Sequence, residues 1–83
     1  MQITVKLYAT LTDYLPPDAE KHATKIDVDG DATPYSVIDC FKVPREMAHL
    51  VLLNGIYLQP ADRDRPTLKD GDTLAVWPPV AGG

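Results

Sequence analysis

The sequence predicts one small α+β domain, in which a single short helix accompanies several strands. Three observations predict this class. Residues 2–8 alternate polar and apolar side chains, as a half-buried strand does. Residues 33–41 combine helix-capping residues with apolar residues at helical spacing. Asn54-Gly55 and Asp70-Gly71, which separate apolar runs, are turn dipeptides that favour connections between strands.

In the first half of the chain we expect two strands joined by a long connection. The first strand covers residues 2–8 and places its apolar side chains on one face. A short helical turn is expected at residues 9–15, where Pro16-Pro17 ends it. The second strand covers residues 23–28, in which the alternation is less regular.

The helix has two candidate starts. In one, Ser36 is the N-cap and Asp39 reaches back to it as the reciprocal partner. In the other, Thr33 is the N-cap and Pro34 occupies the first helical position. Pro44 disfavours helical geometry at the residue before it, so the helix is expected to be short. The apolar face of the helix consists of Val37, Ile38 and Phe41.

The second half of the chain is expected to contain three strands. An apolar run at residues 49–53 leads into Asn54-Gly55, the turn of a hairpin whose return strand covers residues 56–58. A charged loop is expected at residues 61–66. The last strand covers residues 73–77, and the C-terminal tail follows it directly.

Composition argues against several classes of protein. The 83 residues carry a formal net charge of −4 without a basic stripe, so a nucleic-acid partner is not expected. No apolar run approaches the ~20 residues that span a bilayer, and the first residues do not resemble a signal peptide. The single cysteine fits a reducing compartment. We therefore expect a cytoplasmic protein without a membrane or nucleic-acid partner.

Metal and thiol chemistry are not expected. Residues 27–31 are acidic, but an EF-hand loop starting there would lack the glycine and the glutamate that calcium loops need. His22 and His49 lie far apart with no other ligand at metal-binding spacing. We expect His22 to be solvated and His49 to be half-buried. Cys40 is expected on the core side of the helix, where it would be inert.

The C-terminal tail is the part of the sequence most specific for function. Pro78 and Pro79 favour an extended path. Gly82 and Gly83 have no Cβ, so the backbone of another protein can close around them. We expect a folded domain over residues 1–77 and a flexible tail over residues 78–83, ending in a carboxylate that is ionised at neutral pH. The residues expected to thread into a partner's narrow active site are Pro78, Pro79, Val80, Ala81, Gly82 and Gly83.

Trp77 ends the last strand immediately before this tail. Two roles remain open for it. It is either a hydrophobic anchor that fixes where the tail leaves the sheet, or a contact with the partner, because tryptophan is enriched in binding hot spots.

Residues 68–83 resemble the C-terminal segment of the ubiquitin-like sulfur carriers of the MoaD/ThiS family, the small subunit of molybdopterin synthase and its relative in thiamine synthesis. The resemblance rests on the turn at Leu68-Lys69-Asp70-Gly71-Asp72, the strand after it and the Pro-Pro-Val-Ala-Gly-Gly ending. Looser matches lie at residues 5–9, 36–39 and 51–55. The resemblance implies a β-grasp fold, a mixed sheet of about four to five strands with one short helix packed on one face.

The resemblance also implies a reaction at Gly83. An E1-like adenylating enzyme would use ATP to adenylate the Gly83 carboxylate, and a persulfide sulfur would then displace AMP to leave a thiocarboxylate. This chain has no phosphate-binding loop, so we expect it to bind no cofactor and to perform no catalysis alone. The sulfur would pass to a large molybdopterin synthase subunit or to another sulfur-accepting enzyme.

Several functions share this tail. The proline pair favours synthesis of the molybdenum or tungsten cofactor, although residues 9–17 are not typical of that branch. Alternatives are a sulfur carrier for thiamine thiazole synthesis, a ubiquitin-like modifier joined to protein lysines through Gly83, and an interaction domain with an idle tail. Carrier and modifier both begin with the same adenylate, so the tail does not separate them.

Overall fold

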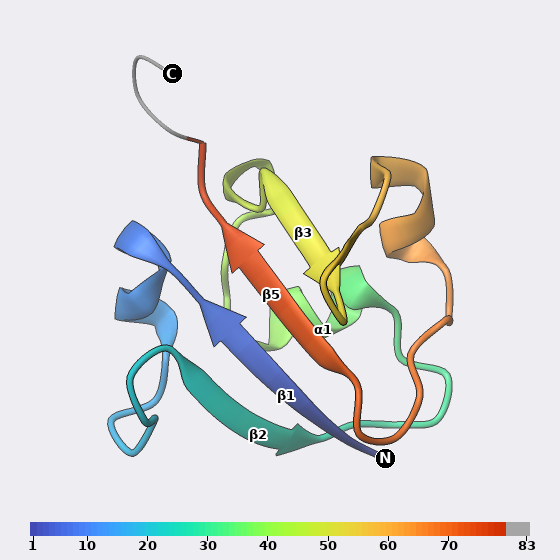
Figure 1. Cartoon of the computed structure of the whole chain (residues 1–83), viewed down its shortest axis with the longest axis horizontal. Coiled ribbons are helices and arrows are strands. Elements are labelled where there is room, and N and C mark those ends of the chain that lie inside the picture. Colours follow the sequence, from blue (N-terminus) through green and yellow to red (C-terminus); the bar gives the residue numbers. More distant parts are fainter. Residues whose placement is uncertain (80–83) are drawn as a thin grey trace.

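The structure is a computed structural model of the chain and describes residues 1–79. Within these residues five strands form one mixed sheet in the order β2-β1-β5-β3-β4 (Figure 1). The strands are β1 (Gln2–Leu7), β2 (Ala23–Asp27), β3 (Leu50–Leu53), β4 (Ile56–Tyr57) and β5 (Thr73–Trp77). The helices are α1 (Pro34–Cys40) and the 3₁₀ helices η1 (Ala9–Tyr14), η2 (Arg45–Met47) and η3 (Pro60–Asp64).

The last strand, β5, lies in the middle of the sheet. It runs parallel to β1 and antiparallel to β3, while β2 and β4 form the two edges. The helix α1 crosses the face of the sheet that points away from the viewer in Figure 1. This topology is a ubiquitin-like β-grasp fold, as the family resemblance implied.

The alternation in the strands places one face of the sheet against α1 and η1. Each fully buried aliphatic side chain in this layer contributes about 1.5–3 kcal/mol relative to an exposed one. Two of these side chains, Leu74 and Val76, belong to β5, so the strand from which the tail leaves is part of the core. The side chains without exposed surface include Ile3, Val5, Leu7, Leu11, Val37, Ile38, Val51, Leu74 and Val76.

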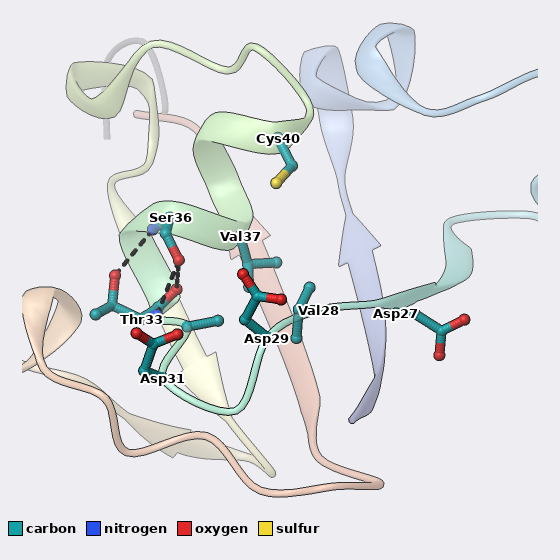
Figure 2. A pocket seen from close by; sticks show the side chains of 9 residues that line it. Asp27, Val28, Asp29, Asp31, Thr33, Ser36, Val37 and Cys40 are labelled. Carbon is teal, nitrogen blue, oxygen red and sulfur yellow. Dashed lines mark hydrogen bonds between the residues drawn. The ribbon is translucent and has the colours of Figure 1, made fainter.

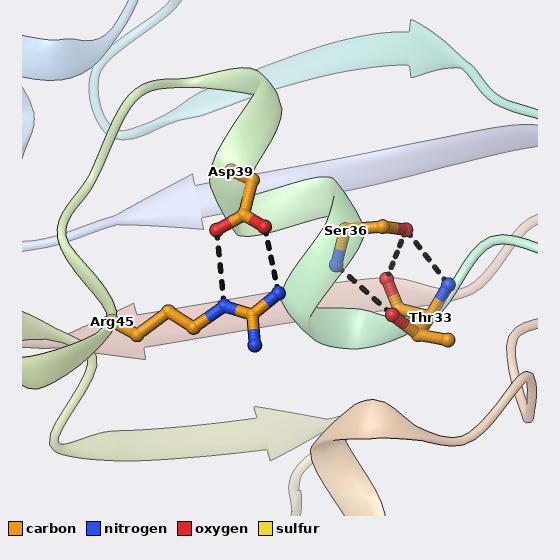
Figure 3. Close-up of polar contacts among 4 residues, drawn as sticks. All are labelled: Thr33, Ser36, Asp39 and Arg45. Carbon is orange, nitrogen blue, oxygen red and sulfur yellow. Dashed lines mark hydrogen bonds and ion pairs between the residues drawn. The ribbon is translucent and has the colours of Figure 1, made fainter.

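The helix begins at the second of the two predicted starts (Figure 3). The Ser36 amide donates to the Thr33 hydroxyl at 3.0 Å, and the Thr33 amide donates to the Ser36 hydroxyl at 2.8 Å. The prediction of Ser36 as N-cap was wrong, because Pro34 presets a helical φ and starts the helix earlier. Asp39 instead accepts two hydrogen bonds from Arg45, which raise the pKa of that guanidinium above its ordinary value.

Removing this cap tests its contribution to stability. Thr33→Ala is expected to lower the free energy of unfolding by about 1 kcal/mol, because the Ser36 amide then loses its acceptor. Urea denaturation followed by circular dichroism measures the change. The matched control is Thr67→Ala, at an exposed position whose hydroxyl has no hydrogen bond within residues 1–79, and it is expected to stay within about 0.5 kcal/mol of wild type. Equal stabilities for the two variants would contradict the assigned cap.

Three further predictions differ from the structure. Cys40 is exposed and not on the core side, because the buried face of α1 is centred on Val37 and Ile38 and the cysteine lies on its flank. His49 is exposed and not half-buried, since it lies just before β3 at the end of the sheet. The charged loop predicted at residues 61–66 is largely the helix η3. His22 is exposed, as predicted.

Candidate functional site

The point where the chain leaves β5 is held from both sides by backbone hydrogen bonds. On the β1 side, the Tyr8 amide donates to the Val76 carbonyl at 3.1 Å. On the β3 side, the His49 amide donates to the Trp77 carbonyl at 3.0 Å. The sheet pairing on this strand therefore continues as far as its last residue. Proline has no N–H, so Pro78 cannot extend the ladder.

The structure places only part of the predicted tail. Pro78 is buried and Pro79 is exposed. The first residue after β5 is therefore packed against the domain. Threading by Val80, Ala81, Gly82 and Gly83, and the reaction of the Gly83 carboxylate, concern residues outside the described range and stay predictions.

Three aromatic rings form a stack beside the exit. The Trp77 ring is stacked on the Tyr8 ring, with centroids 4.3 Å apart and planes inclined by 2°. Tyr8 is in turn stacked on His22, with centroids 4.8 Å apart and an interplanar angle of 26°. Trp77 keeps part of its surface exposed. Both predicted roles of Trp77 therefore remain open, since the ring packs against its neighbours and still offers a face to a partner.

Two leucines extend this aromatic surface across the sheet. Leu50 pairs with Trp77, and Leu52 pairs with Ala75, which precedes Trp77 by two residues in β5. Residues opposite each other in an antiparallel pair lie on the same face. We call the half-buried side chains Tyr8, Leu50, Leu52 and Trp77 the exit surface. It adjoins the tail and is apolar, as the centre of a protein interface is.

Of the exit surface, Tyr8, Leu50 and Leu52 were not predicted as site residues. A signal existed for Tyr8, because this aromatic residue continues the solvent-facing phase of the alternation one residue past the end of β1. Leu50 lay in an apolar run that showed no alternation, so its face followed only from the register with β5.

A second feature is a shallow hollow beside the start of α1 (Figure 2). The hollow lies at the end of the sheet opposite the exit, because Asp27 pairs with Gln2 at the beginning of β1. The residues that line it and are labelled in Figure 2 are Asp27, Val28, Asp29, Asp31, Thr33, Ser36, Val37 and Cys40. Within residues 1–79 no group of three or more His, Cys, Asp and Glu side chains is arranged to hold a metal ion.

Arg63 is buried, with 3% of its surface exposed, although it lies in a charged segment. Its guanidinium donates to the backbone carbonyls of Leu58, Ala48 and His49 at 3.0, 2.9 and 3.2 Å. It also donates to the Tyr57 hydroxyl at 3.3 Å. No pattern in the sequence distinguished Arg63 from the exposed Arg65 two residues later.

The fold and the exit of the tail define a ubiquitin-like β-grasp protein. The chain belongs to the Mut7-C ubiquitin family, whose model matches residues 1–82. The searched set of curated proteins contains no match to this sequence. Along residues 1–79, no helix is long and apolar enough to cross a membrane.

Solved structures with the same fold include two from Haloferax volcanii. SAMP1 is 28% identical, with a TM-score of 0.67, and the match covers 100% of both chains. The HVO 2177 protein is 27% identical, with a TM-score of 0.77, over 100% of this chain and 87% of the other.

A chain in the complex of subunits 1 and 2 of the molybdopterin-converting factor from Helicobacter pylori 26695 is more distant. It is 17% identical, with a TM-score of 0.56 over 100% of both chains, and at that identity the likeness concerns the fold alone. The predicted resemblance therefore holds at the level of a ubiquitin-like β-grasp protein similar to SAMP1, and the chain in the converting-factor complex shares the fold.

Proposed function

We propose that this chain is a sulfur carrier whose Gly83 carboxylate is adenylated and converted to a thiocarboxylate for synthesis of the molybdenum or tungsten cofactor. The observation that carries the proposal is the place where the chain leaves the sheet. Pro78 follows the central strand directly after a point where both neighbouring strands hold the backbone. A reactive terminus presented in this way can be inserted into another protein while the domain stays folded.

The proposed chemistry has three steps, all in the active sites of partner enzymes. The adenylating enzyme joins the Gly83 carboxylate to AMP and releases pyrophosphate, which turns a poor electrophile into an acyl group with a good leaving group. The terminal sulfur of a persulfide attacks this carbonyl and displaces AMP, so an acyl disulfide forms. A second thiol reduces the S–S bond, is itself oxidised to a disulfide, and releases the thiocarboxylate.

In this proposal the adenylating enzyme binds the ATP. The chain docks on the partner enzymes and brings its Gly83 carboxylate into their active sites, and the reaction takes place in the cytoplasm. Residues 78–83 extend at most ~20 Å, at 3.3–3.6 Å per residue. A buried active site is therefore reached only if the domain docks at its mouth. The exit surface is the apolar region adjacent to the tail, so we assign docking to Tyr8, Leu50, Leu52 and Trp77. The accepting partner would be a large molybdopterin synthase subunit or another sulfur-accepting enzyme.

A second candidate function is a protein modifier, joined through Gly83 to lysines of other proteins. The similarity to SAMP1 favours it, since one matching structure, 25% identical to this chain, is described as small archaeal modifier protein 1. A carrier for thiamine thiazole synthesis would use the same thiocarboxylate as the first proposal. The enzyme that accepts the sulfur distinguishes those two pathways.

Mass spectrometry of the intact protein, purified from its own cells, separates carrier from modifier. For a sulfur carrier we expect a species heavier by about 16 Da, because sulfur replaces one carboxylate oxygen. A modifier would instead give peptides in which Gly83 is linked to a lysine of another protein. A variant lacking Gly82 and Gly83, expressed in the same cells, is the control and is expected to show neither product. Only the unmodified mass in wild type under sulfur-replete growth would contradict both functions.

A further inference from the structure

A chain of hydrogen bonds joins the buried Arg63 to the exit of the tail. Arg63 Nη1 donates to the Ala48 carbonyl at 2.9 Å. The amide N–H of the same peptide unit belongs to His49, and it donates to the Trp77 carbonyl at 3.0 Å. That carbonyl in turn belongs to the peptide unit that links Trp77 to Pro78. Two peptide units therefore connect the guanidinium to the first bond of the tail.

The groups around Arg63 indicate that it orients the backbone. Within residues 1–79 no carboxylate forms an ion pair with Arg63, and its four acceptors are neutral. Three of them are backbone carbonyls from two segments, residues 48–49 and Leu58. A planar guanidinium presents its donors in a rigid fork, so it fixes the relative orientation of the carbonyls it binds.

The charge of Arg63 also strengthens the bond at the exit. A hydrogen bond from a cation to the Ala48 carbonyl polarises that peptide unit. A polarised peptide is a better donor at its N–H, since hydrogen bonds in series reinforce one another. Within residues 1–79 the bond from the His49 amide to the Trp77 carbonyl is the last pairing between β3 and β5 at this end of the sheet, and neither Pro78 nor Pro79 has an N–H to donate beyond it.

We propose that Arg63 is a positioning residue for the C-terminal tail. It holds the peptide unit between Ala48 and His49, which fixes the carbonyl of Trp77 and so the direction in which Pro78 and Pro79 leave the sheet. The expected effect of Arg63 on adenylation rests on the proposed function. Its effect on the hydrogen bond between His49 and Trp77 concerns this chain alone. A tail that leaves in another direction presents Gly83 to the adenylating enzyme in fewer productive orientations, while the exit surface still docks.

The experiment compares the full chain with Arg63→Met, Arg63→Lys and Arg65→Met. Methionine keeps much of the buried stem without donors, and lysine keeps the charge without the fork. Arg65→Met is the matched control, since Arg65 lies two residues away, is exposed and pairs only with Asp62 within residues 1–79. Nuclear magnetic resonance detects the scalar coupling through the hydrogen bond from the His49 nitrogen to the Trp77 carbonyl carbon. The coupling from Tyr8 to Val76, on the other side of β5, is the internal reference.

In both Arg63 variants we expect the His49–Trp77 coupling to fall by at least about 10–30%, the cooperative contribution of one hydrogen bond, with the Tyr8–Val76 coupling unchanged. Arg65→Met is expected to keep both couplings. Adenylation, measured by pyrophosphate exchange with the activating enzyme of the same organism, is expected to lose about tenfold in kcat. KM for the chain should stay within about twofold, because the docking surface is intact.

A folded Arg63 variant with a wild-type His49–Trp77 coupling would overturn the proposal. So would equal losses at both couplings, or failure of both variants to fold, because either result would make Arg63 a general support of the domain. If Arg63→Met alone fails to fold, Arg63→Lys decides by the same criteria. A wild-type chain that exchanges no pyrophosphate would refute the proposed function and not the geometry, which the couplings test separately.

Discussion

Replacing Gly83 with valine is expected to abolish adenylation of the tail, with a loss of at least about a hundredfold in the rate of pyrophosphate exchange. A branched Cβ beside the carboxylate would collide with an active-site channel shaped around glycine. It would also displace the carboxylate from the α-phosphate that it must attack. Pyrophosphate exchange with the activating enzyme of the same organism measures the rate. A wild-type rate for Gly83→Val would show that the terminal carboxylate is not the reacting group.

The loss should be confined to the reaction. The free energy of unfolding of Gly83→Val is expected to stay within about 0.5 kcal/mol of wild type, because the core side chains lie between Ile3 and Val76. The matched control is Gly30→Val, at the opposite end of the sheet, where within residues 1–79 no heavy atom beyond the glycine and its two chain neighbours lies within 4 Å of the position of an added Cβ. This variant should exchange pyrophosphate at the wild-type rate.

Trp77→Ala is expected to weaken binding to the adenylating enzyme by about 2 kcal/mol, the level of an interface hot spot. The indole ring is held flat against Tyr8, and Trp77 keeps part of its surface exposed. Its loss removes the largest ring of the exit surface and leaves Tyr8 stacked on His22 alone. Isothermal titration calorimetry measures the affinity, and circular dichroism first confirms that the variant is folded.

Two variants make the result for Trp77 specific. Trp77→Phe keeps an aromatic ring on Tyr8 and is expected to lose less than half as much binding free energy. Ile56→Ala removes a side chain that is 71% exposed and lies at the end of the sheet away from the exit, so its affinity should equal that of wild type. A folded Trp77→Ala variant with wild-type affinity would place the docking surface elsewhere. If Ile56→Ala lost as much binding free energy as Trp77→Ala, binding to the adenylating enzyme would not depend on the exit surface in particular.

Most of the fold was predictable because it rests on local patterns. The final strand was predicted at the residues where it occurs, since turn chemistry at Asp70-Gly71 and the proline pair mark its two ends. The alternation of residues 2–8 predicted β1 to within one residue. The helix start was one of two alternatives, and the choice was decided by the fixed φ of Pro34, which acts before any tertiary contact.

Predictions about burial succeeded less often, because burial depends on which elements face each other. Cys40 sits on the same short helix as three buried residues, Pro34, Val37 and Ile38, but it lies on the flank of the buried face and is exposed. Arg63 and Arg65 are indistinguishable in a charged segment. One of them is buried because η3 brings it to unpaired carbonyls of Ala48 and Leu58 that need donors.

Local sequence patterns predicted the class of fold and the chemistry proposed for the tail, because turns, alternation and a Gly-Gly segment are properties of neighbouring residues. The surroundings of the point where Pro78 leaves the sheet followed from tertiary structure. The parallel pairing of β1 with β5 stacks Tyr8 on Trp77, although 68 residues separate them along the chain. The antiparallel pairing of β3 with β5 brings Leu50 and the His49 amide to the same point. Such contacts follow from the strand order, which pairs segments that are distant in the sequence, and a pattern among neighbouring residues does not specify which distant strands lie side by side.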